Sequence, residues 1–344
     1  MGMAAPIYYT SDMVRALPDD GNRYGSRRAA RALGGRVVPA GVSRAAILSA
    51  ALLALPASAL WDAAGHRTVA AIAWEHMTPR ARARAVELLL HGPALANFAS
   101  LRPADGSDAA RDRALFLNAA TWADLVRNRN QAWHVYHHPT WHYADFYWDV
   151  ENGQAHDLPG PRPGPGPAPD SLNAVERIVA LRATLVDSSA ADTTRAVALA
   201  WLLHLVGDVH QPLHCSSRVT PDDPLPHGDA GGNTFRLDDD RNLHGYWDRI
   251  LDASVAPEPG EDSIAYASRM AQRIEGTEAR VPPSADVSGW AQEGLRLAQT
   301  VVYAGVSRGS APSAAYEAEA VKVSEGRIAL AGHRLAALLN EALK

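Results

Sequence analysis

The chain contains a single cysteine, Cys215, among its 344 residues. One cysteine cannot form a disulfide within the chain, and it cannot supply a metal site built from several thiolates. Long apolar runs are scarce too, because the most apolar stretch, residues 45–59, is shorter than the roughly 20 residues that a transmembrane helix needs. We therefore expect neither stabilisation by disulfides nor anchoring by a membrane-spanning helix.

An excess of basic charge is also missing. The first 60 residues hold 7 of the 33 Lys and Arg residues but only 3 of the 38 Asp and Glu residues, which leaves a net charge of −9 on residues 61–344. Proteins that hold nucleic acid by neutralising its phosphates need a basic surface. The acidity argues against a non-catalytic nucleic-acid-binding protein, but not against an enzyme whose metal ions meet the phosphate.

The apolar run at residues 45–59 ends in small residues, which is the pattern of a secretory signal peptide. We expect a signal region at residues 45–60, export to the periplasm or the exterior, and no membrane anchor. An apolar N-terminal helix that stays attached is the alternative. Residues 1–44 form an N-terminal extension to which no role is assigned, because Met3 or Met13 could equally start translation.

Hydrophobic residues recur at three- and four-residue spacing along most of the remaining chain, as in amphipathic helices. The sequence therefore predicts an all-α protein, built as a single-domain multi-helix bundle over residues 61–344. Residues 152–169, rich in proline and glycine, are predicted to form a long surface loop. A short hairpin is expected at most, around NTFRL at residues 233–237. Helices are predicted at about residues 67–90, 111–127, 171–188, 192–211, 262–278, 287–305 and 314–343.

Fourteen histidines stand out in the composition, and the strongest motif containing them is AWLLHLVGDVHQPLH. His204 and Asp208 are four residues apart, so on a helix they share one face. Pro212 should end that helix, which leaves His214 in the following turn, within reach of a neighbouring ion. His210 lies about 240° round the helix from His204 and is interpreted as structural.

The four-residue spacing returns at His244 and Asp248 in NLHGYWD. Asp124 in TWAD, His142 in WHYAD and His66 in WDAAGH are further candidates. Nitrogen and oxygen donors of this kind suit zinc. Taken singly, a histidine is more often a hydrogen-bonded polar residue than a metal ligand, so it is the order and spacing of the whole set that favours a metal centre.

In order along the chain, the segments WDAAGH, TWAD, WHYAD, HLVGDVHQPLH, GDAGGN and NLHGYWD resemble the motifs of the trinuclear-zinc, single-strand-specific nucleases of the S1/P1 type, which are related to zinc-dependent phospholipase C. The 96 residues after Asp248 match only in helical pattern. The resemblance implies an all-α fold, three zinc ions and hydrolysis of single-stranded DNA and RNA to products with 5′-phosphates. Nucleotides as substrates, through removal of 3′-phosphates, and no obligate protein partner are also implied.

The resemblance further implies how the ligands are shared among the ions. The third ion would need the free amine and carbonyl of Trp61, and hence cleavage just before that residue. Leu60 stands where signal peptidase prefers a small residue, and cleavage after Ala59 would leave Leu60 in front of the tryptophan. The implied sets are Asp124, His142, His204 and Asp208 for one zinc, His214, His244 and Asp248 for a second, and Trp61, His66 and Asp208 for the third.

Four more residues receive roles from the resemblance. It places Asp145 near the attacking water, Arg127 near the substrate phosphate, and Tyr143 where an aromatic ring stacks on an unpaired base. Asn233, which follows the glycines of GDAGGN, is expected to support the substrate-binding site through a hydrogen bond. The alternatives are packing for Tyr143, an ion pair with an acid for Arg127 and contact with a histidine for Asp145.

Two other functions compete with a nuclease. Phospholipase C shares the helical scaffold and most ligands, but the five-residue step from Trp61 to His66 and an aspartate, not a glutamate, at Asp248 resemble the nucleases. A non-catalytic, zinc-stabilised module would be expected to lack Asp145 or part of the ligand set, and neither is missing. The sequence therefore predicts an exported, zinc-dependent phosphodiesterase acting on single-stranded nucleic acid.

Overall fold

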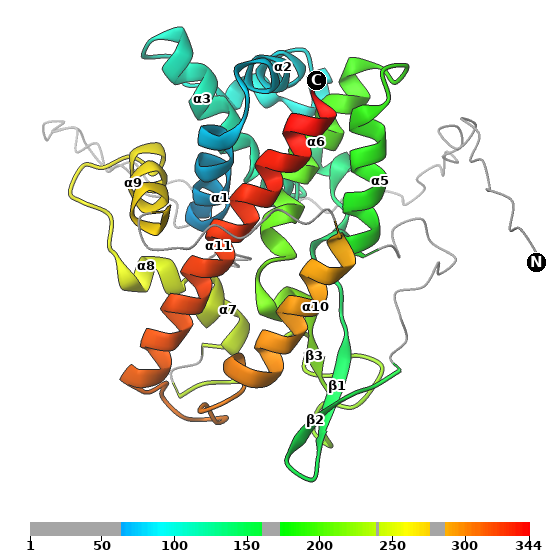
Figure 1. The fold of residues 1–344 in the computed structure, drawn as a ribbon, viewed down its shortest axis with the longest axis vertical. Coiled ribbons are helices and arrows are strands. Elements are labelled where there is room, and N and C mark those ends of the chain that lie inside the picture. The colour runs from blue at the N-terminus through cyan, green and yellow to red at the C-terminus, as the bar shows by residue number, and fades with distance from the viewer. Residues whose placement is uncertain (1–62, 160–172, 239–240, 276–285) are drawn as a thin grey trace, which may run out of the picture. The chain divides into compact units, whose positions relative to one another are not determined.

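The computed structural model describes residues 63–159, 173–238, 241–275 and 286–344. The N-terminal extension, the predicted signal region and Trp61 lie outside these ranges. The described part is mostly helical, with one small sheet (Figure 1), so the all-α prediction is confirmed. Its elements are α1 (Ala63–His76), α2 (Pro79–Leu90), α3 (Asp108–Ala119), α4 (Trp122–Leu125), β1 (Tyr147–Glu151), β2 (Gln154–Asp157), α5 (Ala174–Val186), α6 (Asp192–Asp208), β3 (Ser217–Arg218), α7 (Leu243–Asp248), α8 (Ile250–Ser254), α9 (Ser263–Glu275), α10 (Val287–Leu297) and α11 (Ala314–Ala342), with a π-helical turn at Ala298–Val302 and 3₁₀ turns at Ala94–Ala96, Phe98–Leu101, Ala132–Tyr136, Pro139–His142 and Pro212–Cys215.

The helix predicted at residues 67–90 is in fact two helices, so that prediction is wrong at its centre. The side chain of Thr78 accepts a hydrogen bond from the amide of Ala81 at 3.2 Å, and Pro79 occupies the first turn of α2. A proline has no N–H to give to a preceding turn, so it suits the start of a helix and interrupts a continuous one. The threonine and proline together end α1 and begin α2.

At residues 233–237 the predicted short hairpin is present only as a brief antiparallel contact, an isolated bridge between Arg236 and Asn242 with a backbone hydrogen bond on each side of it. A hairpin of two longer strands lies elsewhere in the chain. The hairpin pairs β1 with β2 through Asn152 and Gly153, whose φ angles are 52° and 77°. Two central residues with positive φ form the turn that matches the twist of paired strands, and Asn-Gly favours it. The first part of the predicted loop at residues 152–169 is therefore the strand β2, and β3 pairs parallel to β1 on its other edge.

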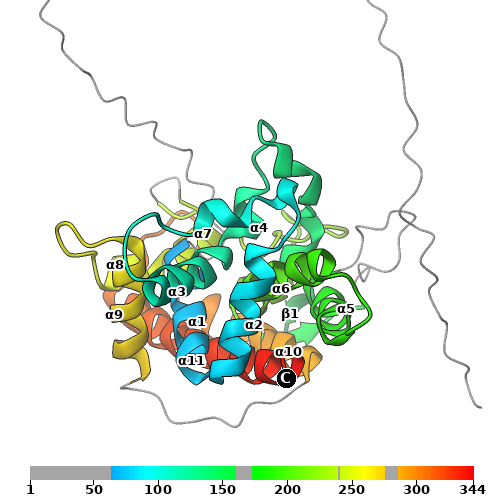
Figure 2. The same cartoon turned by 90° about the horizontal axis from the view of Figure 1, so that it is seen from above.

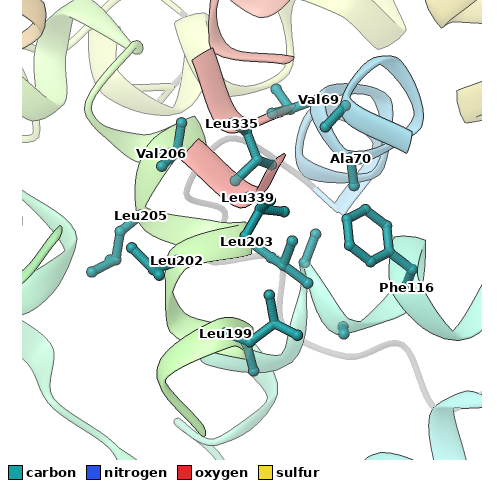
Figure 3. Packing of buried hydrophobic residues seen from close by; sticks show 14 of the residues in the cluster. Val69, Ala70, Phe116, Leu199, Leu202, Leu203, Leu205, Val206, Leu335 and Leu339 are labelled. Carbon is teal, nitrogen blue, oxygen red and sulfur yellow. The ribbon is translucent and has the colours of Figure 1, made fainter. Parts of the chain in front are cut away.

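The buried hydrophobic residues form two clusters, and the larger one, the first cluster, contains the apolar side chains of α6. Helix α6 contacts α1, α2, α3, α4, α5 and α11 (Figure 2). Nearly every residue from Ala196 to Asp208 is buried. A helix that is apolar all round has to be enclosed by others. Figure 3 shows part of this packing, with Leu203 and Val206 of α6 beside Leu335 and Leu339 of α11.

A second, smaller hydrophobic cluster packs around α7. It includes Leu243 and Trp247 of α7, Trp148 of β1 and Tyr316 near the start of α11. The indole N–H of Trp247 donates to the hydroxyl of Tyr316 at 2.8 Å, which satisfies the one polar atom that the ring buries. Helix α11 therefore contributes to both clusters, with its first turns in one and the rest in the other.

At 29 residues α11 is long, yet it carries many charged and polar side chains. Within the described ranges, every helix falls short of the length or the hydropathy that a bilayer-crossing segment needs.

The crossing of α1 and α11 depends on a glycine. A Cβ placed on Gly332 would lie 2.5 Å from the Cβ and Cγ2 atoms of Ile72, which is far closer than two carbon atoms pack. Both residues are in the core, where neighbours have little room to move. The absence of a side chain at Gly332 therefore sets the closeness of this helix pair.

We predict that Gly332→Ala destabilises the fold by about 1–3 kcal/mol through overpacking, measured by urea unfolding. The same change in an unhindered helix is expected to stabilise by about 1 kcal/mol. Gly289→Ala in α10 is the control, because a Cβ there meets only the movable carboxylate of Asp286. A Gly332→Ala variant as stable as the control would contradict this account of the crossing.

Candidate metal centre

The C-terminal end of α6 carries the first part of the centre. His204 and Asp208 share a face, as predicted, with His204 Nε2 3.2 Å from Asp208 Oδ2, and neither side chain is exposed. The other ring nitrogen, His204 Nδ1, donates to the backbone carbonyl of Ala120 at 2.8 Å. Because a carbonyl can only accept, Nδ1 must carry a proton in this bond. In the neutral ring the lone pair is then on Nε2, which faces Asp208.

His66, from the first turn of α1, packs directly on this pair. Its ring stacks on that of His204 with centroids 3.8 Å apart, and His66 Nε2 lies 3.4 Å from Asp208 Oδ1. Gly207 makes the approach possible, since a Cβ there would lie 2.7 Å from His66 Nδ1. The glycine in the VGD sequence thus lets α1 bring its histidine against α6.

His142 and Asp124 approach from the other side. His142, at the end of the 3₁₀ turn Pro139–His142, places Nδ1 3.0 Å from Asp208 Oδ2 and 3.1 Å from His204 Nε2. Asp124 in α4 lies 3.9 Å from His204 Nε2 through Oδ1 and keeps part of its carboxyl exposed. The first candidate set of four residues is therefore brought together around Asp208.

The second candidate set forms around Asp248 of α7. His214 Nε2 lies 3.8 Å from Asp248 Oδ1, and His244 Nε2 lies 3.4 Å from Asp248 Oδ2. Both histidines donate Nδ1–H to backbone carbonyls at 2.8 Å, His214 to His142 and His244 to Gly231. These bonds again direct both Nε2 atoms toward the carboxylate.

Several buried histidine nitrogens and aspartate oxygens of the centre have no hydrogen-bond partner among the described residues. Leaving such an atom unpaired in the interior costs about 1–3 kcal/mol, and more for a charged group. Atoms of this kind, gathered at one place from five residues, fit a group that accepts lone pairs. They are both ring nitrogens of His66, Nε2 of His142 and of His214, Oδ1 of Asp208 and Oδ2 of Asp248.

The donor atoms form three overlapping groups in which all atoms lie within 4.8 Å of one another. Imidazole nitrogen with carboxylate oxygen is a donor set for divalent transition metals. The residues therefore fit metal ions by chemistry as well as by position. The groups are His66, His204 and Asp208; Asp124, His142 and His204; and His214, His244 and Asp248.

The pKa shifts in the centre differ between its histidines. Burial lowers the pKa of His66, His142 and His244, which keeps these rings neutral and their lone pairs available. Burial acts in the same direction at His204, but the two neighbouring aspartates outweigh it and raise its pKa to about 9. A bound cation would displace that proton and supply the positive charge that the two aspartates stabilise.

Asp145 lies beside the two sets. The amide of Ala144 donates to the backbone carbonyl of His214 at 2.7 Å, which holds this stretch against the centre. Burial, helped by the charge of Asp229 and opposed by that of His214, raises the pKa of Asp145 to about 7. The residue as a whole is half-buried.

The other predicted residues are less buried than most of the candidate ligands. Arg127 Nη1 lies 3.4 Å from Asp124 Oδ1, so its guanidinium is tethered to a candidate ligand while staying partly exposed. Tyr143 is half-buried, and burial, helped by the charge of Asp145, raises its pKa. Asn233 is exposed, and its amide donates to the carbonyl of Ala230 at 2.8 Å. Trp61 lies outside the described residues.

The GDAGGN segment has a clear part in building the centre. Asp229 accepts the amide of Gly232 at 3.1 Å and the hydroxyl of Tyr303 at 2.6 Å. Gly231 has a φ of +64°, and a Cβ there would lie 2.4 Å from a backbone carbonyl, so glycine is required. The resulting turn presents the Gly231 carbonyl that orients His244.

Gln211 is a contributor that the sequence did not single out. It is fully buried, and its Nε2 donates to Asp248 Oδ1 at 2.8 Å while its Oε1 accepts the amide of Leu213 at 2.6 Å. Asp248 is thereby held with its other oxygen turned toward His244. The only sequence signal was its position in the HQPLH segment, which says nothing of a partner 37 residues away.

Comparison with known proteins gives a consistent result. A sequence model of the family described as S1/P1 Nuclease matches residues 61–344. Endonuclease 5 of Arabidopsis thaliana is 31% identical over 163 residues, which cover 42% of this chain and 50% of that protein. The chain thus spans about half the length of the plant endonuclease. Nuclease PA3 of Penicillium sp and nuclease P1 of Penicillium citrinum are each 25% identical over 305 residues, which cover 82% of this chain and 97% of each fungal protein.

We predict that Gln211→Leu lowers the metal affinity of the centre about 10–100-fold, because Asp248 loses the donor that orients it. Competition against a chromogenic chelator measures the change. Gln272→Leu, at an exposed position of α9, is the matched control. If the Gln211 variant held metal as tightly as the control, Gln211 would only be filling space.

Proposed function

The chain belongs to the S1/P1 nuclease family, and from this premise we propose that it is a zinc-dependent hydrolase that cuts phosphodiester bonds in single-stranded DNA and RNA and leaves 5′-phosphates. The observation that carries the proposal is the set of buried, unpaired histidine and aspartate donor atoms around Asp208 and Asp248. Removal of 3′-phosphates from nucleotides belongs to the same proposal, because both reactions break the bond between phosphorus and the 3′ oxygen.

We propose three zinc ions in the centre. Asp208 has its two oxygens directed to different histidines, Oδ1 to His66 and Oδ2 to His204, which suits a carboxylate shared between two ions. The third ion depends on the amine and carbonyl of Trp61, and hence on cleavage just before it. The proposed sets are Asp124, His142, His204 and Asp208; His214, His244 and Asp248; and Trp61, His66 and Asp208.

Bound zinc would lower the pKa of water toward neutrality and offset the charge that develops on the phosphoryl oxygens. The chain's own groups then have to place the water and the phosphate. Asp145, half-buried and with a raised pKa, is proposed to accept a hydrogen bond from the attacking water and to receive its proton. Arg127, tethered by Asp124 and partly exposed, is proposed to pair with the phosphate of the substrate.

Preference for single strands would come from stacking and not from surface charge. The net charge of −9 on residues 61–344 gives little general attraction for phosphates. The half-buried ring of Tyr143 is proposed to stack on an unpaired base, a contact that a duplex does not offer. Asn233 is proposed to support this region from the GDAGGN turn.

The proposed domain plan follows the family match. Residues 61–344 would form the nuclease domain, residues 45–60 the signal region and residues 1–44 an extension with no assigned role. We propose export, with the enzyme acting in the periplasm or outside the cell. There the enzyme would meet nucleic acid in solution.

The defining test compares cleavage of single-stranded and duplex DNA by the naturally processed protein before and after chelation. We expect single-strand cleavage that a chelator abolishes and that zinc restores. Absence of cleavage by zinc-loaded protein would reject the nuclease proposal, and phospholipids would be the next substrates to assay.

We predict that Asp145→Asn lowers kcat on single-stranded DNA about 10²–10⁴-fold, the range for loss of a general base. The zinc content should stay as in the wild type, since Asp145 is not among the proposed ligands. Asp105→Asn, on an exposed loop, is the control. A variant with intact zinc and nearly full activity would remove Asp145 from the mechanism.

A further inference from the structure

Two histidines and a glutamate meet outside the proposed nuclease centre. They are His76 at the end of α1, Glu275 at the end of α9 and His333 in α11. The three helices contact one another, and both views show them side by side (Figures 1 and 2). His76 is ten residues after His66 on the same helix, or about 15 Å along its axis, so this cluster is separate from the buried centre.

The donor atoms of this cluster face a common point. His76 Nε2 contacts Glu275 Oε1, and His333 Nε2 lies 3.7 Å from the same oxygen. The two rings are 4.3 Å apart between centroids. All three donor atoms lie within 4.8 Å of one another. In a tetrahedral site with zinc bonds of about 2.0–2.1 Å, donor atoms are about 3.4 Å apart, so small side-chain rotations suffice.

The backbone around His76 is already held in place. Asn340 of α11 donates its Nδ2–H to the carbonyl of His76 at 3.0 Å and accepts the amide of Thr78 at 2.7 Å. The end of α1 is therefore fixed on the same helix that carries His333. A site whose ligands stand on packed helices loses little freedom when the ion enters.

The exposure of the cluster suits entry of an ion from solvent. The side chains of His76, Glu275 and His333 are 36%, 27% and 24% exposed. Arg273, the cation two residues before Glu275, is paired with Glu325 at 2.7 Å, so its charge is offset. Two imidazoles with one carboxylate favour zinc and its neighbours over calcium or magnesium, which prefer oxygen donors alone.

We propose that His76, Glu275 and His333 form a second, surface metal site that binds one zinc-class divalent ion and clamps α9 to the pair of α1 and α11. The ion would have three ligands from the protein and water at its remaining position. An ion held by three helices stabilises the folded chain, because the unfolded chain does not bring these residues together. The site is independent of catalysis.

Zinc content after equilibrium dialysis of the full-length, zinc-loaded protein tests the proposal. Wild type and His91→Ala, which removes an exposed histidine outside the metal-capable groups, should keep the same number of ions. His76→Ala and His333→Ala should each retain one zinc fewer, with unchanged cleavage of single-stranded DNA. Added zinc should also raise the unfolding temperature of these two variants less than that of wild type.

His333→Gln serves as a second variant that keeps a polar side chain if His333→Ala folds poorly. Ion counts equal to wild type in the variants would overturn the proposal and leave a hydrogen-bonded contact between helices. A lost ion accompanied by lost nuclease activity would also overturn it, since the ion would then belong to the central site. Zinc content and unfolding temperature do not depend on whether the chain is a nuclease, so these two readouts test the surface site even if the proposed function fails.

Discussion

A carboxylate with no exposure to water, Asp208, sits among four imidazoles, and much of the fold serves to keep it there. Burying an ionised carboxylate is expensive unless charge and hydrogen bonds compensate for it. The four rings come from α1, from the turn before β1, from α6 itself and from the turn after α6. They are His66 at 3.4 Å, His142 at 3.0 Å, His204 at 3.2 Å and His214 at 3.5 Å from the nearest carboxylate oxygen.

This arrangement lies where two hydrophobic clusters adjoin. His204 and Asp208 stand on α6, whose apolar side chains fill the first cluster, whereas His244 and Asp248 stand on α7, whose neighbours fill the second. Gln211 ties the turn after α6 to Asp248. Metal ions bound to both sets would join the two clusters, so folding, metal affinity and catalysis depend on the same contacts.

The sequence predicted correctly the features that depend on residues close together along the chain. The four-residue spacing placed His204 with Asp208 and His244 with Asp248, and the six ordered motifs led to the family that the comparison confirms. The break between α1 and α2 and the strand β2 were missed because hydrophobic periodicity takes no account of their signals, the Thr78 cap and the Asn152-Gly153 turn. The partner of Gln211 and the meeting of His76 with Glu275 and His333 depend on which helices pack together, and spacing along one helix cannot supply that.

We infer that the buried histidines and aspartates hold metal ions and are not merely hydrogen-bonded to one another. The decisive measurement is anomalous diffraction on either side of the zinc absorption edge, from crystals of the naturally processed protein. We expect peaks at the three donor groups around Asp208 and Asp248. A map with ordered side chains at these residues and no anomalous peak among them would contradict the account.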